Sequence, residues 1–402
     1  MDLDFISKLT KPAKKKIVML VMDGLGGHPI EKGGFTELET ANIPNLDKLA
    51  EKSLCGLQIS IGSGITPGSG PGHLSIFGYD PIKYQVGRGV LAANGIGFNL
   101  KSGDVAARGN FCTVDENGFI LDRRAGRISS ELNQKLCKKL CENIDIEGVE
   151  VFIKTVKEHR FLLVLRGKEL SCDLFDTDPQ VVGKKPLEPR MKTNDGNKIT
   201  NIIKNLINQA GNILSNEHPA NMIILRGFSK KPDWPKFPEV FKLKSAAIAG
   251  YPMYKGLAKL IGMEVLHTGD KLEEEFITLE QNWDDYDFFF IHIKKTDSYG
   301  EDGNFEAKVK IIEEVDSFIP RLMRLNPDVV IVTGDHSTPS LLKFHSWHPV
   351  PTLIYSKQCR PDNVKKFGER SCITGGLGPR LPAVDIMPIA MANALRLEKF
   401  GA

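Results

Sequence analysis

Three apolar segments of the chain each lead into an acidic residue, and this recurrence limits the fold more than any other feature. The segments are Lys16–Met22, Phe288–Ile293 and Val329–Val332, and the acids that follow them are Asp23, Asp297 and Asp335. Nearly continuous apolar runs of this length predict strands buried on both faces, as in a mostly parallel sheet. Open α/β sheets bind their ligands beyond the carboxyl ends of the strands. The chain therefore predicts an α/β fold with carboxylates at several strand ends.

Imidazoles and a further carboxylate accompany these acids. His336 follows Asp335 directly, His345 comes nine residues later, and Glu301 lies four residues after Asp297. Carboxylate oxygens and neutral imidazole nitrogens suit a divalent cation such as Mn²⁺, Zn²⁺ or Mg²⁺. Each residue alone is equally consistent with a polar loop or a simple turn after a strand. Their recurrence in three separate segments favours a site for one or two ions.

Ser69 lies in the glycine-rich segment Ile61–Pro81, just before residues 73–78, which can form a helix. A serine at a turn that leads into a helix can act as a nucleophile, with backbone N–H groups directed at an anionic oxygen. The alternative is a flexible Gly-Ser loop, and no strand-flanked Gly-x-Ser-x-Gly motif is clear here. Beside divalent cations, Ser69 is a candidate nucleophile for metal-assisted phosphoryl or sulfuryl transfer.

The length of 402 residues predicts two domains. The pattern changes near Phe98, where short alternating segments predict antiparallel strands over 108–113, 118–122, 152–165 and 222–225. The proline-rich segment 230–238 predicts a linker, and strand and helix patterns of the α/β type resume after it. Helices are expected over 42–54, 130–141, 200–215, 254–261 and 307–325.

Arginines recur at the predicted strand and loop ends of the middle region, and two acids stand together there. They are Arg123, Arg124, Arg127, Arg160, Arg166 and Arg226, with Asp176 and Asp178. Guanidinium groups that converge on a cleft would bind a phosphate or a carboxylate. Individually, each arginine is also consistent with a surface position or a salt bridge.

Composition indicates neither a nucleic acid nor a membrane as a partner. The net charge is +3, and the basic run Lys11–Lys16 is interpreted as a solvated tail rather than a binding patch. No segment approaches the length of a membrane span, and the N-terminus lacks the pattern of a secretion signal. Seven cysteines without a CxxC pair suggest thiols in a reducing compartment, so a cytoplasmic location is expected. Nothing indicates an oligomeric state.

Seven segments together resemble, in order and spacing, the short archaeal-type 2,3-bisphosphoglycerate-independent phosphoglycerate mutases of the alkaline phosphatase superfamily. They are MDGLGG (22–27), IPNLDKLA (43–50), TPGSGPGHLSIFGYDP (66–81), HIKKTDSYGEDG (292–303), VTGDHSTP (332–339), HSWHPVP (345–351) and GGLGPRLPAVDIMPI (375–389). The resemblance implies a phosphatase-like sandwich with a mostly parallel central sheet flanked by helices. That domain would comprise residues 1–97 and 240–402, and a smaller α+β substrate domain would be inserted at 98–239.

The resemblance also implies two divalent ions, with Mn²⁺ expected and Mg²⁺, Co²⁺ or Zn²⁺ as alternatives. One ion would be held by Asp23, Ser69, Asp335 and His336, and the other by Asp297, Glu301 and His345. The chain departs from the family at Glu301, where a histidine is expected. Because glutamate can bind a hard ion, the site would survive with a changed metal preference, and His348 is a hypothetical compensating ligand.

The implied reaction converts 3-phosphoglycerate to 2-phosphoglycerate in glycolysis and gluconeogenesis through a phosphoserine at Ser69. The expected substrate-binding residues are Asp122, Arg123, Arg127, Arg160, Asp176, Arg226 and Lys255. His73 and Asp178 would neutralise the phosphoryl group or position protons, and Lys255 has a surface position as its alternative. A metal-dependent phosphatase, a sulfatase, a phosphopentomutase or a catalytically impaired binding homologue remain the competing interpretations.

Overall fold

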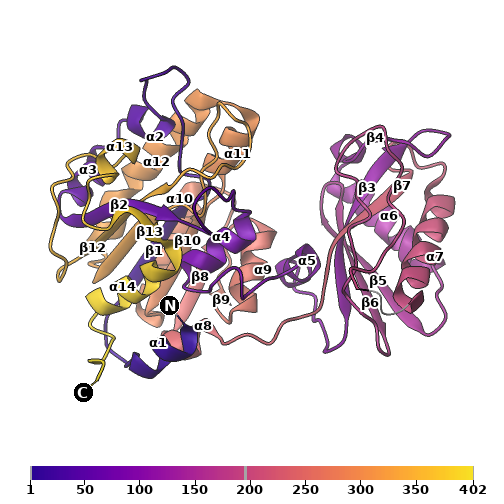
Figure 1. Cartoon of the computed structure of the whole chain (residues 1–402), viewed down its shortest axis with the longest axis horizontal. Coiled ribbons are helices and arrows are strands. Elements are labelled where there is room, and N and C mark those ends of the chain that lie inside the picture. The colour runs from indigo at the N-terminus through magenta and orange to yellow at the C-terminus, as the bar shows by residue number, and fades with distance from the viewer. Residues whose placement is uncertain (1, 194–196, 402) are drawn as a thin grey trace. The chain divides into compact units, whose positions relative to one another are not determined.

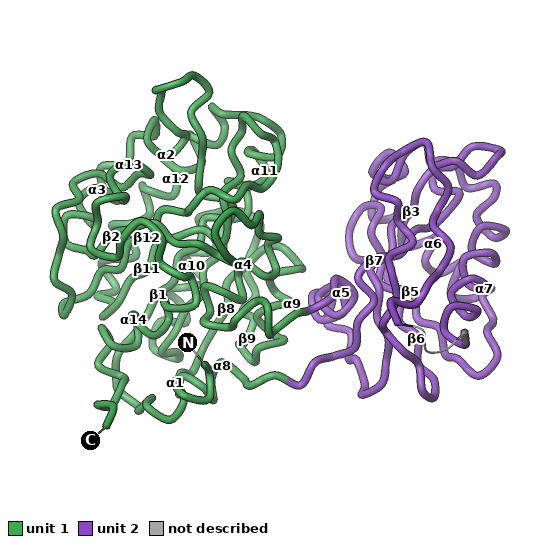
Figure 2. The backbone as a smooth tube through the Cα atoms, viewed as in Figure 1, with its two compact units in different colours: residues 1–85, 234–402 green, residues 86–233 purple. Residues whose placement is uncertain are grey.

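The structure is a computed structural model that describes residues 2–193 and 197–401. It divides into two compact units, which Figure 2 shows in different colours: unit 1 comprises residues 1–85 and 234–402, and unit 2 comprises residues 86–233. Both boundaries lie earlier in the chain than those predicted at 98 and 239. Residues 86–97 join unit 2 because their helix packs on its sheet so closely that a Cβ at Gly89 would lie 2.2 Å from the backbone oxygen of Ala106. Trp234 stays in unit 1 and contacts Tyr84, with 5.6 Å between ring centroids.

Unit 1 contains an eight-stranded mixed sheet within the described residues, in the order β13-β2-β12-β11-β1-β10-β8-β9 (Figure 1). Its strands are β1 (Ile17–Met22), β2 (Ser53–Ile59), β8 (Ser245–Ala249), β9 (Glu264–Val265), β10 (Phe288–Ile293), β11 (Val329–Thr333), β12 (Val350–Ser356) and β13 (Gly378–Pro382). β1 pairs in parallel with both β10 and β11, and all three strands are fully buried. The mostly parallel α/β fold predicted from these apolar runs is therefore confirmed.

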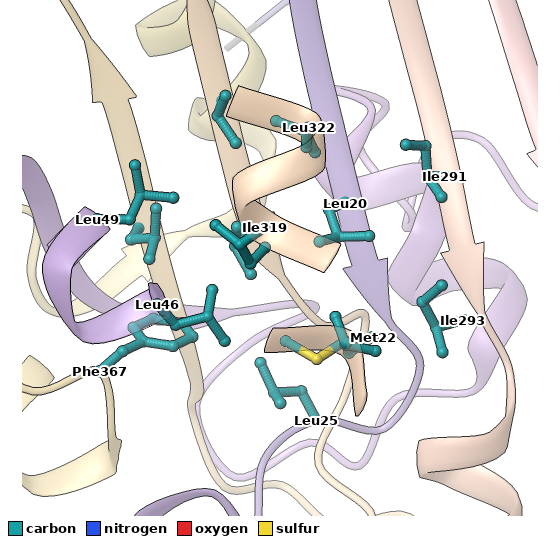
Figure 3. Close-up of a cluster of buried hydrophobic side chains, with 14 of the residues drawn as sticks. Leu20, Met22, Leu25, Leu46, Leu49, Ile291, Ile293, Ile319, Leu322 and Phe367 are labelled. Atoms are coloured by element: carbon teal, nitrogen blue, oxygen red, sulfur yellow. The ribbon is translucent and has the colours of Figure 1, made fainter. Parts of the chain in front are cut away.

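Helices cover both faces of this sheet. They are α1 (Leu3–Leu9), α2 (Glu37–Thr40), α3 (Pro44–Ala50), α4 (Ser69–Ile76), α8 (Phe237–Phe241), α9 (Pro252–Leu260), α10 (Leu272–Gln281), α11 (Lys295–Asp302), α12 (Phe305–Arg324), α13 (Glu369–Cys372) and α14 (Ile386–Asn393), with 3₁₀ turns at Trp283–Asp285 and Ala383–Asp385. On one face, Leu20 and Ile291 of the sheet belong to the same buried cluster as Ile319 of α12 and Leu46 of α3 (Figure 3). The alternation of side chains along each strand sends Phe290 to the other face, where its ring contacts Phe77, with 4.9 Å between centroids.

The longest helix of unit 1, α12, shows why its sequence is helical. The Asn304 side chain caps its first turn by accepting a hydrogen bond from the Ala307 backbone N–H at 3.0 Å. Apolar residues then recur at helical spacing and form a buried stripe: Ile311, Ile312, Val315, Ile319 and Leu322. This stripe anchors α12 on the sheet.

Unit 2 is an antiparallel α+β unit. It contains β3 (Val105–Val114), β4 (Ile120–Asp122), β5 (Val149–Lys157), β6 (Arg160–Gly167) and β7 (Met222–Ser229), with helices α5 (Arg88–Gly95), α6 (Ser130–Asn143) and α7 (Asn197–Leu214) and a 3₁₀ turn at Ala125–Arg127. Its strands run β4-β3-β6-β5, and β7 pairs with β3. The helices and the sheet enclose a separate core that includes Leu136, Phe161 and Ile203.

Two predicted elements differ from the structure. The single alternation predicted over 152–165 is wrong: the chain reverses at Glu158 and His159, so the segment belongs to two paired strands, β5 and β6. Glu158 has a φ of 52°, which a continuous strand would not contain. The helix predicted over 42–54 ends at Ala50, and Ser53 already belongs to β2. No helix within the described residues is long and apolar enough to cross a membrane.

Candidate active site

Candidate ligands from three strands meet at one edge of the unit 1 sheet. Asp23 follows β1, Asp297 lies in α11 beyond β10, and both Asp335 and His336 follow β11. Because β1 lies between β10 and β11 and runs parallel to both, their carboxyl ends coincide. His336 Nε2 lies 3.4 Å from Asp23 Oδ1 and 3.2 Å from Asp335 Oδ2. His345 Nε2 lies 3.5 Å from Asp297 Oδ1. Side chains that are distant in sequence thus form two adjoining groups of candidate metal ligands, called donor groups below. The first contains Asp23, Asp335 and His336, and the second contains Asp297, His336 and His345.

The partners of both imidazoles leave their Nε2 atoms available as ligands. Thr338 Oγ1 donates to Asp297 Oδ1 at 2.6 Å, so its oxygen accepts the hydrogen bond from His336 Nδ1 at 3.0 Å. His345 Nδ1 donates to the backbone oxygen of Pro67 at 3.0 Å. These partners select the tautomer of each ring with its proton on Nδ1, which directs the Nε2 lone pair toward the carboxylates. Burial lowers the pKa of His336 despite the nearby Asp335, which keeps the ring neutral.

The donor set fits divalent cations. Two groups satisfy the distances needed for a shared ion: Asp23, Asp335 and His336, and Asp297, His336 and His345. Asp23 Oδ1 and Asp335 Oδ2 are buried without a hydrogen-bond partner among the described residues, an expensive arrangement unless a cation binds them. Mixed carboxylate and imidazole donors suit Mn²⁺, Zn²⁺, Co²⁺ or Mg²⁺.

Ser69 begins α4 and adjoins the first donor group. Its Oγ lies 3.2 Å from His336 Nε2. The helix can approach this closely because Gly72 has no side chain: a Cβ there would lie 2.5 Å from the backbone oxygen of Asp335. From the other side, Ser60 Oγ at the end of β2 donates to that same Asp335 oxygen at 2.6 Å. The serine hydroxyl is therefore held beside the candidate ligands.

His73 lies behind the donor groups. It is fully buried, and its Nδ1 lies 3.0 Å from Asp335 Oδ2 and 2.8 Å from the backbone oxygen of Ser69. Burial by itself lowers the pKa of His73, but the carboxylates of Asp335 and Asp23 outweigh it and raise the pKa above its ordinary value. This position allows His73 to orient Asp335 and the first turn of α4, whereas its burial keeps it away from solvent.

Asp23 has three further partners that the sequence did not reveal. The Tyr254 hydroxyl donates to Asp23 Oδ2, and His292 Nε2 and Lys294 Nζ lie 3.2 and 3.1 Å from the same oxygen. Burial raises the pKa of Asp23, but Lys294 and the neighbouring imidazoles hold it well below its usual range. Lys294 also donates to Asp297, so one ammonium group bridges the two donor groups. In the sequence, Lys294 is one of two adjacent lysines without a distinguishing signal.

Glu301 and His348 lie at the margin of the site. Glu301 Oε1 is 3.9 Å from His345 Nε2, and the Glu301 side chain is 55% exposed. Burial and the charge of Asp297 raise its pKa. The His348 ring hydrogen-bonds Ser346 Oγ at 3.0 Å and packs against His28 with 5.3 Å between centroids. The candidate ligand groups of the described residues include neither Glu301 nor His348.

The predicted acids of unit 2 have partners of their own. Arg123 makes a bidentate ion pair with Asp178, at 2.9 and 2.6 Å. Arg226 Nε lies 3.5 Å from Asp176, which also accepts from a backbone N–H at 2.8 Å. Asp122 accepts from the backbone N–H groups of residues 124 and 126 at 2.8 and 2.6 Å, so it stabilises a turn. Each of these acids therefore has a partner within unit 2, and their contact with substrate stays a prediction.

Other arginines of unit 2 surround His159, a residue that no sequence motif distinguishes. Its side chain is 1% exposed. Burial lowers the pKa of His159 to about 3, together with the positive charges of four neighbours: Arg160, Arg124, Arg108 and Arg127. Among the residues that the structure describes, neither Arg124 nor Arg127 forms an ion pair with a carboxylate. The loop that carries them holds Ala125 and Arg127 at φ values of 46° and 54°, a strained backbone typical of functional loops.

Lys255 belongs to unit 1 rather than to this arginine cluster. It follows Tyr254 in α9 and is half-buried. The partly buried position is consistent with either a ligand contact or a surface lysine, the two alternatives that the sequence leaves open.

Comparison with known proteins gives one consistent group. A family model described as 2,3-bisphosphoglycerate-independent phosphoglycerate mutase matches residues 50–221. A relative from Aquifex aeolicus, named as a probable 2,3-bisphosphoglycerate-independent phosphoglycerate mutase, is 53% identical over 409 residues and spans 100% of both chains. A relative of the same name from Thermosipho africanus is 54% identical over 398 residues, which cover 99% of this chain and 98% of the relative.

Solved structures show the same similarity. A Pyrococcus horikoshii protein matches with a TM-score of 0.83 and 31% identity, over 97% of this chain and 100% of the other. A cofactor-independent phosphoglycerate mutase from Thermoplasma acidophilum matches with a TM-score of 0.69 and 30% identity, over 94% of this chain and 100% of the other.

Proposed function

Because the chain belongs to the family of 2,3-bisphosphoglycerate-independent phosphoglycerate mutases, we propose that it interconverts 3-phosphoglycerate and 2-phosphoglycerate without added bisphosphoglycerate. The resemblance drawn from the seven motifs is confirmed at the level of the family. The observation that carries the proposed chemistry is the position of Ser69 Oγ, 3.2 Å from an imidazole that adjoins two buried carboxylates. We assign the reaction to glycolysis and gluconeogenesis and the enzyme to the cytoplasm.

Two divalent cations are part of this proposal, and we favour Mn²⁺ over Mg²⁺, Co²⁺ or Zn²⁺. Asp23, Asp335 and His336 would hold one, next to Ser69, and Asp297 and His345 would hold the other. When bound, such ions neutralise phosphoryl oxygens and favour an ionised serine hydroxyl. Glu301 is close enough to His345 to join the second group after a change of rotamer, and we retain it as a candidate ligand.

Ser69 is the proposed nucleophile. Its Oγ forms a bond to phosphorus while the bond from phosphorus to the substrate C3 oxygen breaks, which leaves phosphoserine and glycerate. The C2 hydroxyl of glycerate then attacks that phosphorus, and the bond to Ser69 Oγ breaks. Each step exchanges one alcohol for another, so the proton lost by the attacking hydroxyl balances the proton gained by the departing oxygen. His73 would support these steps by orienting Asp335 and the start of α4.

We assign recognition of the substrate carboxylate and hydroxyls to the arginine cluster of unit 2. Arg127 is the main candidate, because Arg123 and Arg226 are already paired with Asp178 and Asp176. Arg160 is the second candidate, since its ion pair with Glu158 is longer, at 3.7 Å, than the Arg123–Asp178 pair at 2.6 Å. Guanidinium groups bind carboxylates in a bidentate manner and with high directionality. Lys255, in unit 1, is a further proposed substrate contact. Asp122, Asp176 and Asp178 would act by shaping the site.

A mutase assay with 3-phosphoglycerate tests the proposal. Purified protein is incubated with Mn²⁺, Co²⁺, Zn²⁺ or Mg²⁺ in the absence of bisphosphoglycerate, and both 2-phosphoglycerate and inorganic phosphate are measured. We expect 2-phosphoglycerate, and a loss of more than about a thousandfold in Ser69→Ala, since this variant lacks the proposed nucleophile. Ser63→Ala, at an exposed serine of the same loop, should keep wild-type activity. Release of phosphate without 2-phosphoglycerate would indicate a phosphatase instead.

A further inference from the structure

Lys308 occupies a position on α12 where an apolar residue would be expected. It continues the buried stripe that begins at Ile311, and its side chain is 0% exposed. Lysine is almost never fully buried unless it is paired. Here Nζ donates to three backbone oxygens, those of Gly24 at 3.0 Å, Gly26 at 3.1 Å and Thr338 at 2.9 Å. Each of its three N–H groups therefore has a partner.

The three acceptors belong to the two loops that carry the candidate ligands after β1 and β11. The Gly24 backbone N–H donates to Asp335 Oδ1 at 3.1 Å, so the first loop also orients a carboxylate of the second. The Thr338 hydroxyl contacts both Asp297 and His336, at 2.6 and 3.0 Å. The Lys308 acceptors thus belong to residues next to the candidate metal ligands: Gly24 follows Asp23, and the Thr338 hydroxyl contacts Asp297 and His336. Lys308 itself forms no ion pair with these ligands among the described residues.

A second buried charge closes the same arrangement. Glu37 Oε1 lies 3.9 Å from Lys308 Nζ, and both side chains are 0% exposed. Glu37 also accepts from the Ser340 N–H and hydroxyl, both at 2.7 Å, and from the His28 N–H at 3.2 Å. Glu37 therefore contacts the chain just after each ligand loop, at His28 and at Ser340. Its carboxylate also compensates the charge of the Lys308 ammonium group.

Such a buried lysine is costly in free energy. Removing an ammonium group from water costs several kcal/mol, and an apolar side chain would complete the stripe without that cost. The loop carbonyls explain its presence. With an apolar residue at 308, the Gly24 and Gly26 oxygens would share the Thr338 N–H, which lies 3.2 and 3.0 Å from them, and the Thr338 oxygen would lose the lysine donor. We propose that Lys308 is a positioning residue that holds both ligand loops in their metal-binding geometry before any cation binds. This inference rests on the proposed two-cation function.

The sign of the effect separates positioning from simple electrostatics. Loss of a positive charge close to the site should by itself strengthen cation binding. If Lys308 positions the ligands, its removal should weaken binding instead, because the loops lose a shared anchor. Loss of a residue that orients metal ligands typically lowers metal affinity by about 10–100-fold.

The test is the Mn²⁺ affinity of full-length Lys308→Met, measured by titration calorimetry without substrate. We expect a decrease of about 10–100-fold, and partial recovery in Lys308→Arg, which keeps the charge and the donors. Lys310→Met, at an exposed lysine of the same helix, should match the wild type. An affinity for Mn²⁺ equal to or greater than that of the wild type in folded Lys308→Met would overturn the proposal. Absence of Mn²⁺ binding in the wild type would instead contradict the proposed function.

Hydrogen exchange of the wild type provides a test that does not depend on folding of the variant. The Gly24 amide donates to Asp335 Oδ1, and the Thr338 amide donates to the backbone oxygens of Gly24 and Gly26, so both bonds lie within the two ligand loops. In the presence of a chelator, we expect the exchange rates of both amides to lie within about tenfold of the rates of the buried β1 amides, because Lys308 orders the loops without metal. Protection that appears only after Mn²⁺ is added would show that the cation, not the lysine, orders them.

Discussion

His73 in unit 1 and His159 in unit 2 are both buried among charged groups, and the charges around these two histidines have opposite signs. In unit 1, burial opposes protonation of His73, but Asp335, 3.0 Å away, and Asp23 raise its pKa above the ordinary value. In unit 2, burial and the neighbouring arginines, first of them Arg160, lower the pKa of His159 to about 3. Two rings with nearly the same solvent exposure therefore favour opposite protonation states.

The difference shows what each unit is suited to bind. Like charges held close together in a folded protein are destabilising, and such clusters commonly mark a site for a ligand of opposite charge. The carboxylates of unit 1 suit cations, whereas the guanidinium groups of unit 2 suit an anion. Each unit has a hydrophobic core of its own, which provides the stability that the clustered charges reduce. Three predictions test whether the two sites are separable in this way.

The largest effect is expected for Asp335→Asn in unit 1. The variant loses a ligand charge and the partner of His73, so Mn²⁺ affinity should fall by at least about a hundredfold and mutase activity should disappear. Calorimetry measures the affinity, and hydrogen exchange should show no change in unit 2. Asp302→Asn, at an exposed acid of α11, is the matched control. Retention of wild-type Mn²⁺ affinity by Asp335→Asn would remove Asp335 from the metal centre.

A smaller effect is expected for the arginines of unit 2. Arg127→Met or Arg160→Met should raise the KM for 3-phosphoglycerate by about 10–100-fold, the equivalent of one charged hydrogen bond. Mn²⁺ affinity should change by less than about threefold, because no metal ligand is touched. Arg190→Met, at an exposed arginine of the same unit, should leave KM unchanged. A parallel loss of Mn²⁺ affinity in the two cluster variants would mean that the sites are not separable.

The effect expected to be smallest near neutral pH is a pH dependence of stability in unit 2. Between about pH 6.5 and about pH 3, the unfolded chain binds a proton at His159 that the folded unit excludes. The free energy of unfolding is therefore highest above about pH 6.5, and on acidification through that window it falls by up to about 1.4 kcal/mol per pH unit. His159→Gln should flatten this dependence, whereas His218→Gln, at an exposed histidine, should not.

Exchange of β3 amides measures the effect in unit 2, and tryptophan fluorescence reports unit 1 alone, since Trp234, Trp283 and Trp347 all belong to it. An unchanged pH slope in His159→Gln would show that other groups dominate the acid response.

Local patterns predicted the elements that build the ligand edge. The apolar runs ending at Met22, Ile293 and Val332 identified three buried strands, and parallel pairing then places the acids that follow them at one edge. The strands β2, β12 and β13 were not predicted, because their segments mix polar and apolar residues without clear alternation. The reversal at Glu158 and His159 was not predicted either, because the tight turn there lacks glycine or proline.

The sequence by itself determined which chemical groups follow the buried strands, carboxylates and imidazoles, and which serine lies in the glycine-rich segment that leads into a helix. Only the tertiary structure decided how they act. The protonated nitrogen of each ligand histidine depends on Thr338 and on Pro67, and the latter is 278 residues distant from His345. The charge state of His159 likewise depends on arginines from several strands and loops. Hydrogen bonds and Coulomb interactions act over a few ångströms in space, and separation along the chain does not reveal them.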